Sequence, residues 1–249
     1  MEKVKENDFI QLDFTGRVKD GGYIFDTTSE KVAKDNGLYN PEVNYGPITV
    51  CVGKGLVLKG LDKALIGKDL GFDGTLEVTP EDAFGKKDPK MLKLIPSSKF
   101  KSNGVNPQPG LQVNVDGTLG FIKTVTGGRT IVDFNHPLAG KELEYDVLIK
   151  NKVDDVQEQV ESLLTMKLNL KRDNFEVSID DNKALIKLIG LPSVPDEFTT
   201  HMGQFIKDAT VVENVEFMTD SNSGGAGEKN SDDVIAEKTS EDDKSQKSD

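Results

Sequence analysis

The chain has 249 residues, and its 31 lysine and arginine side chains against 43 aspartates and glutamates leave a formal net charge of −12. This negative charge disfavours phosphate backbones and anionic bilayers, so we expect neither nucleic acid nor membrane as a partner. One cysteine excludes an intramolecular disulfide, and no run approaches the roughly 18 uncharged apolar residues of a membrane span. Since the start also lacks the apolar core of a signal peptide, the sequence predicts a cytoplasmic protein.

The first 85 residues have mainly the alternation of β-strands. Apolar and polar side chains alternate over 10–14 and again over 48–52, while the turn residues of 19–22 predict a hairpin. Two short helices are expected within this strand pattern. One covers 29–36 and the other covers 61–66, and a glycine follows each of them.

Residues 87–135 differ in texture from the segments on either side. Short β-prone runs alternate with prolines and glycines, which is typical of a small module built from strands and turns. The long extended pattern resumes only at 142–149. We therefore expect an inserted module, residues 87–135, which splits one domain formed by residues 1–86 and 136–152.

Residues 153–218, here called the C-terminal part, mix two periodicities. Apolar residues recur at helical spacing over 153–164, and they alternate in two runs between 175 and 188. A second helix is expected at 198–206 and a last strand at 211–217. The C-terminal part should therefore be a small α+β domain.

The last segment, 219–249, has the composition of a disordered tail. It carries nine acidic and four basic side chains, and Val234 and Ile235 are its only large apolar residues. Such a segment buries too little apolar surface to offset the conformational entropy that ordering would cost. We therefore expect a disordered acidic tail.

The residues that would support nucleotide, metal or covalent chemistry are missing. Gly55 and Gly60 have the separation of a phosphate-binding loop, but the lysine and hydroxyl residue that must follow are absent. His136 and His201 are the only histidines, and neither has a second ligand at metal-binding spacing. Cys51 lies in an alternating strand without a basic partner, which indicates a core thiol. We therefore expect no metal, no cofactor and no covalent intermediate.

Five short motifs in the first 141 residues point to one protein family. They are Phe14-Thr15-Gly16, Phe25-Asp26-Thr27-Thr28, Val57-Leu58-Lys59-Gly60-Leu61, Ala83-Phe84-Gly85 and Asn135-His136-Pro137-Leu138-Ala139-Gly140-Lys141. In this order they resemble the FKBP-type peptidyl-prolyl cis-trans isomerases. The SlyD-like and long archaeal branch, which has a β module inserted in its flap, is most similar. The last motif is the most specific of the five, because it directly follows an insertion.

The resemblance covers residues 1 to about 152. It implies an antiparallel half-barrel wrapped around one short helix, with a hydrophobic pocket between the helix and the sheet. The fold class expected for the whole chain is therefore α+β. The half-barrel is interrupted by the inserted β module, and the small α+β C-terminal domain and the acidic tail follow it.

The resemblance also implies which residues form the pocket. Five would make the catalytic cage: Phe14, Phe25, Asp26, Phe84 and Tyr145. Four would bind the substrate: Ile48, Val57, Leu58 through its backbone N–H, and Leu61 as the floor. Phe14 stands where a tyrosine is usual in the family, and Leu61 stands where many members have tryptophan. Because a leucine floor is still apolar, we expect activity to survive.

The predicted function is isomerisation of X–Pro bonds in unfolded or partly folded polypeptides. Rotation about such a bond needs no nucleophile or metal, because its barrier comes from amide resonance. The inserted module has more apolar side chains than so small a core can cover, and an exposed apolar groove usually binds a partner. By resemblance that partner is unfolded polypeptide, which would give the module chaperone character.

Two other functions fit parts of the pattern. A non-catalytic holdase would bind unfolded polypeptide through the inserted module and keep a vestigial pocket, but the retained Phe25, Asp26, Phe84 and Tyr145 favour the enzyme. Metal delivery is opposed by a tail that contains neither histidine nor cysteine.

The β-prone runs 175–179 and 211–217 leave sheet edges whose backbone groups need partners. Pairing of these edges across a two-fold axis would make a homodimer through the C-terminal part. A monomer whose edges are covered by a helix is the open alternative, and we favour the homodimer.

Overall fold

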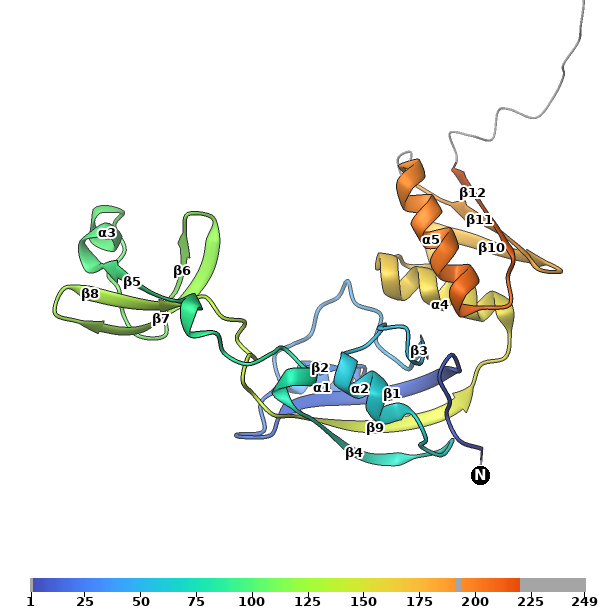
Figure 1. The fold of residues 1–249 in the computed structure, drawn as a ribbon, viewed down its shortest axis with the longest axis horizontal. Coiled ribbons are helices and arrows are strands. Elements are labelled where there is room, and N and C mark those ends of the chain that lie inside the picture. The colour runs from blue at the N-terminus through green and yellow to red at the C-terminus, as the bar shows by residue number, and fades with distance from the viewer. Residues whose placement is uncertain (1, 191–193, 220–249) are drawn as a thin grey trace, which may run out of the picture.

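The computed structural model describes residues 2–190 and 194–219 and arranges them around three β-sheets (Figure 1). The disordered tail expected at 219–249 lies outside these residues, except for Thr219, which ends the last strand. Within the described ranges, no helix combines the length and the apolar character that crossing a membrane requires.

The first sheet is antiparallel and has five strands: β1 (Phe9–Val18), β2 (Ile24–Thr27), β3 (Ile48–Cys51), β4 (Asp73–Val78) and β9 (Leu143–Lys152). β9 lies between β1 and β4, so the chain returns to the middle of the sheet after the inserted module. Two short helices, α1 (Glu30–Asp35) and α2 (Lys59–Leu65), accompany it. The buried Leu61 and Leu65 of α2 pack on the sheet, which confirms the half-barrel around one short helix.

The second sheet is antiparallel and lies in the inserted segment: β5 (Leu92–Pro96), β6 (Gln112–Val115), β7 (Thr118–Thr126) and β8 (Arg129–Asp133), in the order β5-β8-β7-β6. Helix α3 (Ser97–Ser102) was not expected from the sequence. Its six residues follow a proline and bury Phe100 in the core of this sheet, and a helix this short has no readable periodicity. In Figure 1 the second sheet stands away from the first.

Two chain segments connect the first and second sheets, and they are tied to each other. The segment leaving β4 contains the 3-10 turns Pro80–Asp82 and Pro89–Met91. Gly140 N–H donates to the Gly85 carbonyl over 2.7 Å, and the Asn135 side chain accepts from Asp88 N–H over 2.8 Å. Because the outgoing and returning segments are bonded to one another, the insertion begins and ends at one place on the first sheet.

The third sheet belongs to the C-terminal part: β10 (Phe175–Asp180), β11 (Lys183–Leu188) and β12 (Asn214–Thr219), with β11 in the middle. A 3-10 turn (Arg172–Asn174) leads into β10, and β12 runs parallel to β11. Helix α4 (Val156–Leu168) packs on β10, and helix α5 (Asp196–Ala209) packs on β12. The two helices and three strands agree with the mixed periodicity of this part of the sequence.

The C-terminal part packs directly on the first sheet. Phe9 of β1 and Cys51 of β3 belong to the same buried cluster as Leu163 and Leu164 of α4. Burial raises the pKa of the Cys51 thiol to about 12, as expected for a thiol in the core. The core of the C-terminal part is therefore shared with β1 and β3, while the rest of the first sheet packs around its own buried cluster.

Candidate active site

All nine sequence-predicted site residues line one cavity of about 480 Å³ between α2 and the first sheet. They are Phe14, Phe25, Asp26, Ile48, Val57, Leu58, Leu61, Phe84 and Tyr145. Four further residues that sequence reasoning did not assign to the site also line it: Leu56, His136, Leu138 and Met166. The cavity is mostly apolar, and Asp26 brings the carboxylate.

Aromatic rings form one continuous wall of the cavity. Phe25 lies edge-to-face with Tyr145 at 5.8 Å between ring centroids and with Phe84 at 6.2 Å, while Phe14 meets Tyr145 at 5.7 Å. Rings in this geometry attract one another through their quadrupoles. A Cβ on Gly16 would lie only 2.8 Å from Tyr145 Cε1 and 2.9 Å from Phe25 Cζ. The glycine of the first motif therefore makes room for the wall.

His136 extends the wall from the segment that follows the insertion. Its imidazole stacks on the Phe84 ring, with 4.3 Å between centroids and 5° between planes. Leu138 N–H donates to His136 Nδ1 over 3.2 Å, which orients the imidazole. The sequence signal for this residue was the motif at 135–141, which contains both His136 and Leu138.

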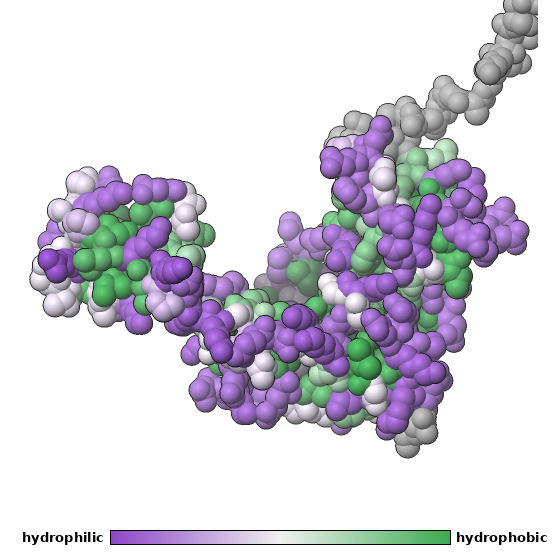
Figure 2. All heavy atoms as spheres, viewed as in Figure 1, coloured by the Kyte–Doolittle hydropathy of each residue, from purple (hydrophilic) through white to green (hydrophobic). Residues whose placement is uncertain are grey.

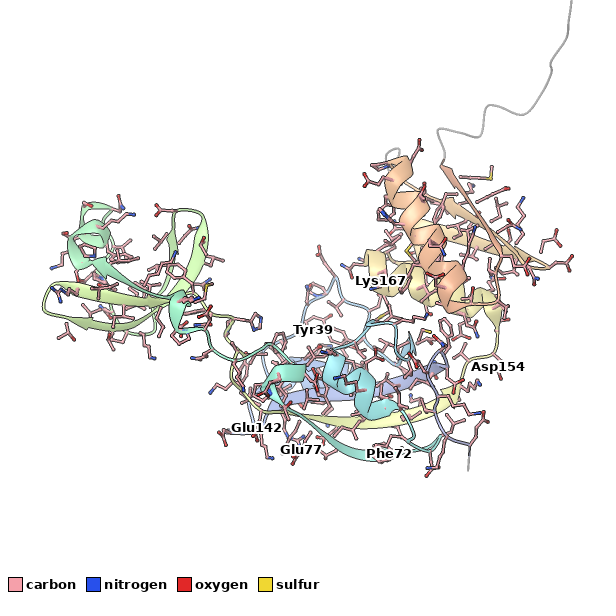
Figure 3. All side chains as sticks on the ribbon, viewed as in Figure 1. Tyr39, Phe72, Glu77, Glu142, Asp154 and Lys167 are labelled. Atoms are coloured by element: carbon pink, nitrogen blue, oxygen red, sulfur yellow. The ribbon has the colours of Figure 1, made fainter. Side chains whose placement is uncertain are left out.

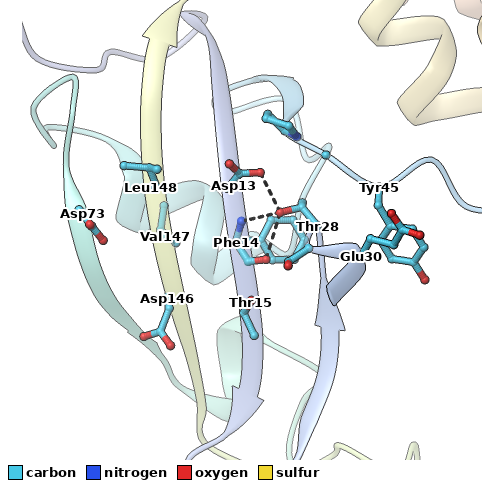
Figure 4. Close-up of a pocket in the computed structure, with 13 residues that line it drawn as sticks. Asp13, Phe14, Thr15, Thr28, Glu30, Tyr45, Asp73, Asp146, Val147 and Leu148 are labelled. Atoms are coloured by element: carbon cyan, nitrogen blue, oxygen red, sulfur yellow. Dashed lines mark hydrogen bonds between the residues drawn. The ribbon is translucent and has the colours of Figure 1, made fainter. Parts of the chain in front are cut away.

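Thr28 holds Phe14 at a gap in the edge of β1. Strand β3 pairs with β1 up to Leu12 and β2 pairs with it from Thr15, so neither covers the backbone between these residues. Phe14 N–H donates to Thr28 Oγ1 over 3.0 Å, and Thr28 N–H donates to the Phe14 carbonyl over 3.0 Å (Figure 4). Thr28 Oγ1 also donates to Asp13 Oδ1 over 3.1 Å. Thr28 therefore replaces a strand partner and fixes the Phe14 backbone.

The Asp26 carboxylate lines the cavity beside neighbouring protein atoms, and Asp26 is exposed to solvent. Desolvation by these atoms raises its pKa, and a hydrogen bond from the Thr27 backbone N–H opposes the rise. Burial and the neighbouring Asp26 charge raise the pKa of Tyr145, so its phenol stays protonated near neutral pH. The wall therefore combines neutral rings with one carboxylate that solvent can reach.

The rim of the cavity is held by Asp62, which sequence reasoning missed. The Asp62 side chain is buried, and its two oxygens accept from Gly53 N–H over 2.8 Å and from Gly55 N–H over 3.0 Å. These bonds close the loop that leads into Leu56, Val57 and Leu58. Because carboxylates are usually surface residues, only the folded loop reveals this role.

Replacing Asp62 with alanine should lower the free energy of unfolding by about 2 kcal/mol, because two backbone donors lose a charged acceptor. The released loop should raise KM for peptide substrates more than it lowers kcat. Chemical denaturation and peptide exchange kinetics measure the two effects, with the exposed Asp20→Ala as control. An Asp62→Ala chain with unchanged stability and KM would contradict this role.

A second cavity, of about 520 Å³, lies on the outer face of the first sheet and is drawn in Figure 4. Its charged groups are largely paired, since Lys150 Nζ lies 2.8 Å from Asp13 Oδ2 and Asp146 is bonded to Arg17. The bond with Arg17 holds the pKa of Asp146 below its ordinary value. Among the described residues, no cluster of three or more histidine, cysteine or acidic side chains could hold a metal ion. The apolar cavity with the aromatic wall is therefore the better candidate site.

A family model described as the FKBP26 IF domain matches residues 93–138, within and just after the inserted segment. The chain is 36% identical over 154 residues to the short-type peptidyl-prolyl cis-trans isomerase of Methanocaldococcus jannaschii, a match that covers 62% of this chain and 94% of that protein. It is 32% identical over 153 residues to a probable FKBP-type 16 kDa peptidyl-prolyl cis-trans isomerase of Pseudomonas fluorescens, covering 59% and 91%. It is 27% identical over 150 residues to the FKBP-type isomerase SlyD of Haemophilus influenzae, covering 58% and 70%.

These matches cover nearly the whole length of the first two relatives. Over a third of this chain lies outside each of the three matched lengths. The relatives bear the family name that the five motifs had suggested, and the half-barrel is the fold that the resemblance implied. The chain therefore belongs to the FKBP-type peptidyl-prolyl cis-trans isomerases.

Proposed function

We propose that this isomerase acts on X–Pro bonds in the cavity beside α2 and holds unfolded clients on the inserted module. Residues 1–86 and 136–152 would form the catalytic domain, 87–135 the chaperone module and 153–218 a small α+β C-terminal domain. The observation that carries the proposal is the convergence of nine predicted residues, which come from four strands, one helix and the loops beside them, on one cavity.

The proposed mechanism is non-covalent. Amide resonance gives the X–Pro bond a barrier of roughly 18–20 kcal/mol, and the planar amide is more polar than the twisted one. The apolar cavity strips water from the amide and so favours the twisted state, while the aromatic wall holds the proline ring. Leu58 directly precedes α2, where N–H groups have no helical acceptor, so its N–H is suited to bind a substrate carbonyl. Catalysis then arises from binding that strengthens as the bond twists.

The inserted module offers an apolar surface for client polypeptides. Five large apolar side chains on it are more than a third exposed: Met91, Leu94, Leu111, Leu119 and Phe121. Figure 2 shows hydrophobic residues gathered on the visible face of this module. A groove of about 490 Å³ lies between α3 and β6 and is lined by Phe100, Val105 and Val113 among others. Exposed apolar side chains and the groove lie beside β6, a strand at the edge of the second sheet. This combination supports binding of an extended, unfolded segment.

Two assays on the full chain test this proposal. Cis/trans exchange of short X–Pro peptides reports the cavity, and we expect a preference for an apolar residue before proline. Refolding of a protein client limited by proline isomerisation reports the cavity and the module together. The alternative, a holdase with a vestigial pocket, requires peptide exchange at the rate of buffer alone and suppression of client aggregation.

We further propose a homodimer through the third sheet, acting in the reducing cytoplasm that the single buried cysteine favours. β10 and β12 each pair with β11 alone among the described strands, so both leave an edge open. Light scattering at micromolar concentration should find a dimer for the full chain and for a chain ending at Thr219. The double variant Glu176→Lys with Ser178→Lys should weaken a β10 pairing by like-charge repulsion. A monomeric full chain would overturn the dimer.

A further inference from the structure

One residue of the active-site cavity comes from the C-terminal part. Met166 lies in the last turn of α4, is partly exposed, and packs against the apolar cluster of the first sheet while it lines the cavity. The other twelve lining residues come from the segments 1–86 and 136–152. The C-terminal part therefore contributes to a cavity that motif reasoning assigned to the half-barrel alone.

Contacts across the shared core hold α4 in place. Phe9 and Cys51 are buried in the same cluster as the middle of the helix, and both are at most 2% exposed. At the start of α4, Thr49 Oγ1 of β3 lies 3.4 Å from Glu158 Oε1. Lys54 Nζ donates to the Asp208 carbonyl, at the end of α5, over 2.8 Å. Because apolar packing and polar bonds act together, Met166 has a defined position relative to the cavity.

The end of α4 is fixed as well. Lys167, labelled in Figure 3, lies over the Phe205 ring of α5 at 4.8 Å from its centroid. Asn169 adopts a left-handed conformation with φ 52° and ends the helix just beyond. Leu163 and Leu164 point into the shared core and are fully buried. Met166 is thus the side chain of this turn that reaches the cavity.

Leu56 links Met166 to the rest of the rim. It packs against the cluster of the first sheet and against the cluster shared with the C-terminal part, and it lines the cavity beside Val57 and Leu58. The loop that carries Leu56 is the one closed by Asp62. A substrate that reaches past the proline ring toward this rim meets an apolar surface made of Leu56 and Met166, whose side chains are both flexible.

We propose that Met166, together with Leu56, forms a subsite for the side chain of the residue next to the substrate proline, and that Met166 sets its preference for apolar side chains. The inference rests on the proposed role of the cavity in binding X–Pro bonds. A thioether side chain adapts to apolar groups of different shape. A charged side chain placed there would lose water without gaining a partner. The C-terminal part would then help to determine which residue the enzyme accepts next to the proline.

The test uses the full chain and two series of short peptides, one varied before the proline and one varied after it, with leucine, alanine, lysine or glutamate at that position. In the series whose varied side chain occupies the subsite, Met166→Ala should lower kcat/KM about fivefold for the leucine peptide, chiefly by raising KM. For the alanine peptide of the same series, kcat/KM should fall less than twofold. Met166→Lys should also raise kcat/KM for the glutamate peptide and lower it for the lysine peptide. Met166→Leu should keep the wild-type preference.

Phe198→Lys is the matched control, because Phe198 is an exposed apolar residue of α5 in the same part of the chain and lies neither on the cavity nor on the strand edges proposed to pair. Circular dichroism checks that each variant is folded, and Met166→Gln carries the polar test if Met166→Lys unfolds. Unchanged leucine-to-alanine and glutamate-to-lysine ratios in folded Met166 variants would overturn the subsite and leave the proposed function standing. A wild-type chain that does not accelerate peptide exchange would overturn both.

Discussion

The double variant Asp26→Ala with Phe84→Ala should lower kcat/KM for peptide exchange by about 100-fold or more if these two side chains act on the twisting bond as we propose. Phe84 contacts Phe25 on one side and stacks on His136 on the other, so its loss opens the aromatic wall to water. Asp26 is the carboxylate beside these rings. Peptide exchange followed with a cis-enriched substrate measures the loss.

This variant should stay folded. Folding raises the pKa of the Asp26 carboxyl. The stability that this group contributes is therefore fully present below the pKa it has in the unfolded chain, and it is lost as the pH rises through the pKa it has in the folded chain. Asp26 is also exposed to solvent, so replacing it with alanine should cost little stability at neutral pH. Phe84 is only partly buried, so its truncation should cost less than the roughly 3–5 kcal/mol of a fully buried phenylalanine.

The control for this prediction removes side chains of similar type from the opposite face of the same sheet. Asp73 and Leu148 are paired across β4 and β9 and line the outer cavity. Asp73→Ala with Leu148→Ala should leave exchange within about twofold of wild type, since no lining residue of the aromatic cavity is changed. Equal losses in the two double variants would place the catalytic site elsewhere.

Excising residues 87–133 and joining the ends with a short loop should reduce catalysed refolding of protein clients by about 10- to 100-fold, because binding energy remote from the reacting bond is lost. Short-peptide exchange should stay within about twofold of wild type, since every lining residue of the cavity lies outside the excised segment. The ends are close enough for this design. Lys87 Nζ lies 3.4 Å from Asp133 Oδ2, and Gly140 N–H bonds to the Gly85 carbonyl.

A second variant keeps the inserted module and changes only its exposed apolar side chains. Leu94 and Leu119 are 58% and 59% exposed, so Leu94→Glu with Leu119→Glu should leave the second sheet folded. It should slow client refolding in the same direction as the excision, since charges replace the apolar groups that would hold the client. If both variants slow peptides and proteins equally, the module serves the fold of the catalytic domain and does not bind clients.

The sequence alone was enough for the features that repeat along the chain or occur as short motifs. Alternation at 10–14 and 142–149 predicted β1 and β9, because a strand that is buried on one face must alternate. The five motifs contain seven of the nine residues that the fold gathers around one cavity, and the family resemblance that the motifs revealed added Ile48 and Tyr145. Turn residues and prolines marked where the chain leaves the first sheet and returns. Each of these signals depends on residues that are close together in the sequence, so the sequence alone displays it.

Only the tertiary structure decided how distant segments meet. Phe9 and Cys51 look like ordinary buried strand residues in the sequence. Nothing in the residues beside them indicates that they pack in one buried cluster with α4. Asp62 becomes a loop anchor because two N–H groups of 53–55 fold back onto it. Met166 has the spacing of any helical residue and reaches the cavity because α4 packs on β3. Such contacts depend on how whole elements pack, and the sequence records that packing only through many weak interactions summed over the folded chain.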